Sequence, residues 1–263
     1  HRYITTMPYI KHTAQRTKLR ILISGFPNSG KTTSFITFIY GGYDYHDERE
    51  HDEAVEYASN KHMAILVAPG EFGIRSLPQD TPHITSYYYE TSDSENINSA
   101  DWSKHAITGF NNISQQVIKD KPDILVIDGL HALWSHLMNR TTNGDFLAGL
   151  DLNVDPTTGK NNTYRSAKFY SQAHHAFGQY VAGLYNSSIP LVVCTTWEEW
   201  EGGRQEGDKP AEISDTKYLW PAIPGKMAKE VVGKFDMRLS ARLEKECQHT
   251  ATCKYSSAKE PEY

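Results

Sequence analysis

The chain has 263 residues, of which 38% are hydrophobic and 22% are charged, and its formal net charge is −5. This length and composition are typical of one soluble globular domain with a sizeable core and polar surface loops. The negative net charge provides no general attraction for nucleic acid, so binding of that kind requires a local basic patch, and the balance argues against a protein that coats DNA.

Three cysteines at unrelated spacings predict neither a disulfide framework nor a zinc site, which favours a reduced compartment, the cytoplasm. No apolar run is long enough to span a bilayer, and the first residues lack the apolar core of a signal peptide. Residues 1–18 form a basic N-terminal arm, interpreted either as a nucleic-acid contact or as a solvated tail. We expect one domain over residues 19–245 and a polar tail over residues 246–263.

Apolar runs alternate with helical patterns along the chain. In chain order we expect a strand at 19–24, a helix at 32–40, strands at 63–68 and 84–90, a helix at 102–119, a strand at 123–128, a helix at 170–184, and strands at 189–196 and 234–243. Polar segments predict loop insertions near residues 43–60, 139–165 and 198–216. Strands that alternate with helices predict an α/β fold with a doubly wound, mostly parallel sheet.

Residues 25–32 match the P-loop pattern, a glycine, four residues and then Gly-Lys-Thr, between the first strand and the first helix. Backbone N–H groups in such a loop, with the positive end of the following helix, make a nest for a triphosphate. The Lys31 ammonium would reach the β- and γ-phosphates of ATP, and the Thr32 hydroxyl would bind Mg²⁺. The expected nucleotide contacts are Gly25, Asn28, Ser29, Gly30, Lys31, Thr32, Thr33 and, from a later strand, Thr196.

Asp128 ends an apolar strand, as the second P-loop signature does, and is expected to bind the same Mg²⁺; the alternative is an aspartate that caps a turn. Hydrolysis needs a group that orients water, and Glu71, just beyond the second strand, is the candidate catalytic base. An exposed turn glutamate is the alternative, and Glu198 and Glu199 are rivals for the same role. One of the two threonines at residues 195–196 is expected to sense the γ-phosphate.

The order of these parts resembles the RecA-like P-loop ATPases, and most closely the short phage-encoded ATP-binding (AAA-type) proteins that act as recombinases or single-strand annealing partners. The resemblance spans residues 19–243. It rests on the P-loop at 25–33, the Gly-Glu-x-Gly-x-x-Ser-Leu stretch at 70–77, the strand at 124–128 followed by Gly-Leu, the Thr-Thr strand end, and residues 224–239.

The resemblance implies a RecA-like core that hydrolyses ATP with Mg²⁺ and serves phage DNA recombination, annealing or replication in the host cytoplasm. It also implies that Glu71 is the base. In a homo-oligomer, basic residues of one subunit would close the ATP site of the next. Here those residues would be Lys226, Lys229 or Lys234.

The resemblance further implies two DNA-binding loops, which fall at residues 139–165 and 198–216. The second is rich in acidic residues, and a groove that follows phosphates should not be acidic. Contact with single-stranded DNA would therefore fall to basic residues of the first loop. These are Arg140, Lys160, Arg165 and Lys168.

Two other functions stay open. One is a P-loop kinase, in which Arg204 would belong to a lid over the phosphates. The other is a nucleotide-gated assembly protein with little hydrolysis, which is favoured if Glu71 points away from the γ-phosphate. Sheet order separates the ATPase from the kinase, because RecA-like sheets insert a strand, here residues 189–196, between the P-loop strand and the strand that ends at Asp128.

Overall fold

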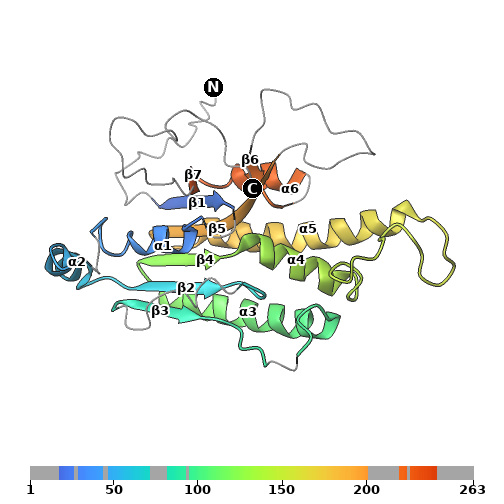
Figure 1. The fold of residues 1–263 in the computed structure, drawn as a ribbon, viewed down its shortest axis with the longest axis horizontal. Coiled ribbons are helices and arrows are strands. Elements are labelled where there is room, and N and C mark those ends of the chain that lie inside the picture. Colours follow the sequence, from blue (N-terminus) through green and yellow to red (C-terminus); the bar gives the residue numbers. More distant parts are fainter. Residues whose placement is uncertain are drawn as a thin grey trace, which may run out of the picture.

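A computed structural model describes residues 18–26, 29–43, 47–71, 82–92, 95–200, 219–223 and 226–241 (Figure 1). Within these residues, six parallel strands form one sheet in the order β3-β2-β4-β5-β1-β7, and a short β6 pairs antiparallel with β5. The strands are β1 (Leu19–Gly25), β2 (Met63–Val67), β3 (Ile84–Tyr87), β4 (Ile124–Asp128), β5 (Leu191–Trp200), β6 (Leu219–Pro221) and β7 (Met237–Ala241). The expected α/β fold with a mostly parallel sheet is confirmed.

Helices cover both faces of this sheet. They are α1 (Lys31–Ile36), α2 (His51–Ala58), α3 (Ala100–Asp120), α4 (Leu130–Thr141), α5 (Thr163–Asn186) and α6 (Lys226–Val232). Leu22 and Cys194 belong to the apolar cluster formed with α3, α4 and α5, whereas Ile23 and Val193 belong to the cluster formed with α1 and α2. The clusters separate because successive residues of a strand point to opposite faces.

The strand order carries the expected insertion. β5 lies between β1 and β4 and pairs in parallel with both, with Leu191 opposite Leu19 on one side and Ile124 on the other. Figure 1 shows the arrows of these strands pointing the same way, so their carboxyl ends share one edge. The loop after β1 and the last residue of β4, Asp128, therefore meet at that edge.

Helix faces and ends agree with the periodicity. The Ser99 hydroxyl caps α3 by accepting a hydrogen bond from the Trp102 backbone N–H at 3.1 Å, and α3 ends at Asp120, shortly before Pro122. The side chains of α5 that face the core match the predicted stripe: Ala173, Phe177, Val181 and Leu184 are buried, and Tyr170 and Tyr180 pack partly buried against them. No helix that the structure describes is long and apolar enough to cross a membrane.

Two segments expected to be loop insertions contain helix. Within residues 43–60, α2 occupies His51–Ala58 and buries Ala54 and Ala58 in the cluster below α1. Within residues 139–165, α4 continues to Thr141 and α5 begins at Thr163. Acidic and polar composition concealed α2, because the side chains that it buries are alanines. The sequence did not predict α4 either, although it buries large apolar side chains such as Trp134, Leu137 and Met138.

The remaining predicted elements differ from the observed ones at their ends. The first helix stops at Ile36 rather than at residue 40, and β3 stops at Tyr87 rather than at residue 90. β5 extends to Trp200, and the rest of the loop expected at 198–216 lies outside the described residues, as do Arg204, residues 1–17 and the tail from residue 242.

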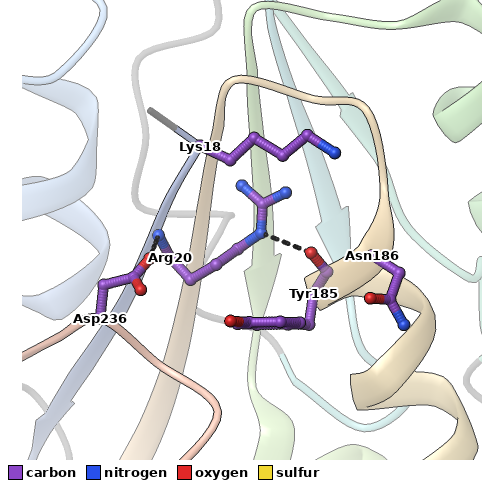
Figure 2. A pocket seen from close by; sticks show the side chains of 5 residues that line it. All are labelled: Lys18, Arg20, Tyr185, Asn186 and Asp236. Atoms are coloured by element: carbon purple, nitrogen blue, oxygen red, sulfur yellow. Dashed lines mark hydrogen bonds between the residues drawn. The ribbon is translucent and has the colours of Figure 1, made fainter. Parts of the chain in front are cut away.

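Arg20 is a buried arginine at the amino end of β1. Its guanidinium donates hydrogen bonds to the carbonyl oxygens of Ser187 and Ile189, both at 3.0 Å, and of Tyr185 at 3.3 Å. Figure 2 shows the side chain reaching from β1 toward the end of α5, while Asp236 accepts from the Arg20 backbone N–H. Arg20 thus satisfies carbonyls that the end of a helix leaves without intrahelical partners.

Replacing Arg20 should destabilise the fold. We expect Arg20→Met to lower the free energy of unfolding by about 2–4 kcal/mol, because buried carbonyl oxygens would lose their donors. Urea unfolding followed by circular dichroism measures the change. Lys18 is exposed and lines, with Arg20, the pocket drawn in Figure 2. Lys18→Met is therefore the matched control and should change stability by less than about 0.5 kcal/mol. Equal losses in the two variants would contradict this role for Arg20.

Candidate functional site

The P-loop begins where β1 ends, and its first glycine has no room for a side chain. A Cβ on Gly25 would lie 2.5 Å from the Ala241 carbonyl oxygen of β7 and even closer to the Ser29 hydroxyl. The backbone turns at once, because the Ser29 N–H donates to the Phe26 carbonyl oxygen at 3.2 Å. Gly30 then precedes α1 in the left-handed conformation. Any side chain at position 25 would displace either the loop or β7.

Lys31 is the positive centre of the loop. Its Nζ donates to the carbonyl oxygens of Gly25 at 3.1 Å and of Phe26 at 2.7 Å, so the side chain folds back over the loop. Burial lowers the pKa of Lys31, and the nearby carboxylates of Glu71 and Asp128 oppose that effect. An ammonium held in this way attracts anions, since it is poorly hydrated and its neighbours keep it charged.

Beside Lys31, the Asp128 carboxylate and the Thr32 hydroxyl place two oxygen groups close together. The Thr32 hydroxyl lies 3.5 Å from Asp128 Oδ2, and the Thr195 hydroxyl donates to Asp128 Oδ1 at 2.5 Å. Burial raises the pKa of Asp128, while the hydrogen bond from Thr195 and the charge of Lys31 lower it. The sequence expectation placed Thr32 and Asp128 at one site, and the structure brings them together.

This donor set fits Mg²⁺. The ion prefers oxygen ligands and is held by one or two protein groups together with water and substrate phosphates. In the described part of the chain, no group of three or more His, Cys, Asp or Glu side chains could enclose a metal ion. A hydroxyl and a carboxylate next to a glycine loop that holds a buried lysine are compatible with Mg²⁺ and unlike a closed transition-metal site.

The two threonines of β5 point to opposite faces. Thr195 faces Asp128, and its oxygen also accepts from the Gly129 N–H at 2.9 Å. Thr196, the residue selected from the sequence, lies on the other face, and its buried hydroxyl has no hydrogen-bond partner among the described residues. The Ser29 hydroxyl in the loop is likewise buried without such a partner among them. Thr195 is therefore the threonine that contacts the proposed metal ligand. Asn28 and the Thr33 side chain lie outside the described residues.

Glu71 follows β2 and lies against the turn after β4. Its backbone N–H donates to the Ala68 carbonyl oxygen at 3.0 Å, which closes a tight turn. Gly129, at a φ of 99°, leaves room for the carboxylate, because a Cβ there would lie 2.9 Å from Glu71 Oε2. Of the carboxylates whose charge raises the pKa of Lys31, Glu71 has the largest effect. The tertiary structure thus brings Glu71 to the residue that follows Asp128.

His131 on α4 is a site residue that sequence reasoning missed. Its Nε2 lies 3.3 Å from Glu71 Oε2, and its Nδ1 accepts a hydrogen bond from the Trp197 backbone N–H at 3.3 Å. Burial, helped by the charge of Lys31, lowers the pKa of His131 to about 3, so the ring is neutral. No motif marks this histidine, because its contacts come from segments about 60 residues away on either side.

Glu198, a rival for the base, is a buried structural group on the opposite face. Its Oε1 accepts from the Ser24 hydroxyl at 2.5 Å and from Arg238 at 2.9 Å, and Ser240 donates within 3.2 Å of both oxygens. Its side chain is 1% exposed. The network joins β5 to β1 and β7, so these oxygens are engaged in holding strands together. The side chain of Glu199 is outside the described residues.

The basic residues named from the sequence have different surroundings. Lys229, Lys234, Lys160 and Lys168 are exposed. Arg165 is engaged within its own segment, because it donates to Asp145 at 2.6 Å and to the Val154 carbonyl oxygen at 2.9 Å. Arg140 is half-buried at the end of α4, and the Lys226 side chain is outside the described residues.

Comparison with known proteins identifies no family, because no protein-family model matches the chain and a search of curated proteins finds no match. The functional inference therefore depends on the chemistry at the carboxyl edge of the sheet. There a cationic loop, a hydroxyl–carboxylate pair and a second carboxylate lie together. Such a set can bind a phosphorylated anion with a divalent cation and can orient water.

Two buried histidines should make the fold sensitive to acid. Burial lowers the pKa of His131 to about 3 and that of His136 to about 4, from 6.5. Below 6.5 the unfolded chain binds protons that the folded chain does not, so stability falls as pH falls. We expect each histidine to remove about 1.4 kcal/mol per pH unit from about pH 6 down to its folded pKa.

The measurement is urea unfolding at pH values from 7 to 4.5, in the intact chain and in two variants. His131→Asn and His136→Asn should each flatten the pH slope by one histidine's share, whatever they do to stability at pH 7. His105→Asn, at an exposed position of α3, is the matched control. If both buried-site variants keep the full slope, these imidazoles are not the acid-sensitive groups.

Proposed function

We propose that this chain is a magnesium-dependent ATPase with a RecA-like core. The observation that supports it most is the strand order, in which β5 separates the P-loop strand β1 from β4 and its terminal Asp128. The same order disfavours a P-loop kinase, whose sheet has those two strands side by side. The motif, the strand order and the carboxylate after β2 agree with one another, although they come from separate parts of the chain.

The phosphates of ATP would lie over the loop that follows Gly25. Their oxygens would replace the loop carbonyls as acceptors for Lys31 Nζ, which lies within reach of the loop backbone. Thr32 and Asp128 would hold Mg²⁺, which would neutralise charge on the β- and γ-phosphates. Thr195 would keep the Asp128 carboxylate oriented through its 2.5 Å hydrogen bond.

Glu71 is the base in this proposal. It stands on the same side of the sheet edge as Asp128, beside Gly129, and its charge acts on Lys31. A carboxylate so placed can accept a proton from water that attacks the γ-phosphate. Glu198 is disfavoured because Ser24, Ser240 and Arg238 already donate to its oxygens. A nucleotide-gated assembly protein with little hydrolysis is the alternative if Glu71 proves dispensable.

The process that ATP hydrolysis would serve is phage DNA recombination, annealing or replication, in the host cytoplasm. This part rests on the resemblance, together with exposed basic residues around the start of α5. Lys160 and Lys168 are exposed there, whereas Arg165 is held by Asp145. In a homo-oligomer, the exposed Lys229 and Lys234 are the described candidates to close the site of a neighbouring subunit.

ATP hydrolysis by the purified chain tests the proposal. Lys31→Ala should abolish hydrolysis and weaken ATP binding, and Lys119→Ala, at an exposed residue of α3, is its matched control. Glu71→Gln should lower kcat by about 10²- to 10⁴-fold while ATP still binds, because only the proton acceptor is lost. Glu198→Gln should reduce stability and keep most of kcat.

The outcomes separate the readings. Loss of kcat in Glu71→Gln with retained binding supports the ATPase. ATP binding without magnesium-dependent turnover in the intact chain would favour the assembly protein. Full kcat in Glu71→Gln, with loss in Glu198→Gln, would transfer the role of base to Glu198 and refute the assignment made here.

Single-stranded DNA should bind and stimulate hydrolysis through the exposed lysines. Replacing Lys160 and Lys168 by Glu should weaken binding and reduce the salt dependence, with the slope of log affinity against log salt falling by about 1.4 for two lost phosphate contacts. Fluorescence anisotropy of a labelled oligonucleotide measures both. The control is the paired change of Lys104 and Lys119 to Glu on the exposed face of α3. Equal effects in the two pairs would mean that binding is not localised to residues 160–168.

A further inference from the structure

Three segments that are distant in the sequence converge on the Glu71 carboxylate. The turn after β2 carries Glu71, the turn after β4 brings Gly129 beneath it, and α4 places His131 beside it. The end of β5 completes the group, since Trp197 contacts the other side of the His131 ring. The phosphate loop alone requires none of these contacts, so they call for a separate explanation.

The hydrogen bond to His131 Nδ1 has a defined direction. The Trp197 backbone N–H can only donate, so His131 Nδ1 is its acceptor and carries no hydrogen. A neutral imidazole with a bare Nδ1 has its hydrogen on Nε2. Nε2 lies 3.3 Å from Glu71 Oε2, so the N–H end of a neutral ring is in close polar contact with the carboxylate.

The ring itself is held in place. It stacks on the Trp197 indole with centroids 4.0 Å apart and an interplanar angle of 24°, and His131 is 8% exposed. Trp197 follows Thr195 and Thr196 in β5, and Thr195 donates to Asp128. One short stretch of β5 therefore contacts Asp128 directly and Glu71 through His131.

We propose that His131 is a positioning residue that fixes the Glu71 carboxylate relative to Asp128 and couples both to the end of β5. The inference rests on the proposed ATPase function and assigns to this site the residue that orients its base. His131 itself transfers no proton in this account. Its effect is to restrict Glu71 to one rotamer, which raises the fraction of bound ATP that has the base correctly oriented.

The test compares two substitutions at one position. His131→Leu removes the Nε2–H donor, and His131→Gln restores an N–H near that point. We expect His131→Leu to lower kcat about 10- to 100-fold with little change in the KM for ATP, and His131→Gln to recover most of the loss. His175→Leu, at an exposed histidine of α5, is the matched control for the substitution.

A double-mutant cycle distinguishes positioning from general damage. In the Glu71→Gln background, His131→Leu should cause no further loss of kcat, because there is no base left to orient. Trp197→Ala, at a 40% exposed residue, provides a second route if His131→Leu does not fold. It should lower kcat severalfold in the intact chain and not at all in the Glu71→Gln background.

The kcat values of these variants distinguish failure of the positioning role from failure of the proposed function. If Glu71→Gln lowers kcat and the losses from the second substitution are fully additive, the positioning role is wrong and the ATPase proposal stands. If the intact chain does not hydrolyse ATP, or Glu71→Gln is as active as the intact chain, the proposed function or its base fails first. Unchanged kcat in both His131→Leu and Trp197→Ala would also overturn the inference.

Discussion

The two-sided pairing of β5 is the constraint on which the candidate site depends. β5 pairs with β1 and β4 in parallel, and Leu191 is level with both Leu19 and Ile124. Parallel strands that start level also end near one edge, so the loop after Gly25 and the Asp128 carboxylate must meet. A slip of one residue in the β4–β5 register would turn the Thr195 hydroxyl away from Asp128, because side chains alternate between faces.

Because successive side chains of a strand point to opposite faces, the polar groups at this edge of the sheet form two separate sets with different roles. Asp128, Thr195 and Thr32 lie on the face of the sheet that α1 covers. Glu198 and the side chains that donate to it lie on the other face and join three strands. Both faces contain a buried carboxylate, and the number of donors already bound to each differs. Both oxygens of Glu198 accept hydrogen bonds from neighbouring strands, so this carboxylate stabilises the sheet. Asp128 instead has one oxygen 3.5 Å from the Thr32 hydroxyl, and these two groups can bind the same cation.

How much of the fold and the site could be predicted depends on how far apart in the sequence the interacting residues lie. The apolar strands and the stripe on α5 are local patterns, and the structure contains the corresponding elements. The P-loop motif is local too, and the described residues on either side of it form β1 and α1. The helix α2 was missed because burying Ala54 and Ala58 requires little hydrophobicity, and its acidic residues dominate the composition. Arg20 was expected as a residue of the first strand, yet its guanidinium is buried against carbonyls about 165 residues away. A charged residue beside a strand gives no sign of such a partner.

The local chemistry is evident from short stretches of the chain: a strand, a glycine loop with Lys31 and Thr32, and a carboxylate at the end of another apolar strand. Those features depend on spacing within a few residues, which the sequence displays directly. Three features of the site emerge only from the folded chain. Thr195 rather than Thr196 faces Asp128, Glu198 joins neighbouring strands, and His131 contacts Glu71. These outcomes depend on strand order, register and the placement of α4, and contacts across such distances in the chain arise only when the sheet is assembled.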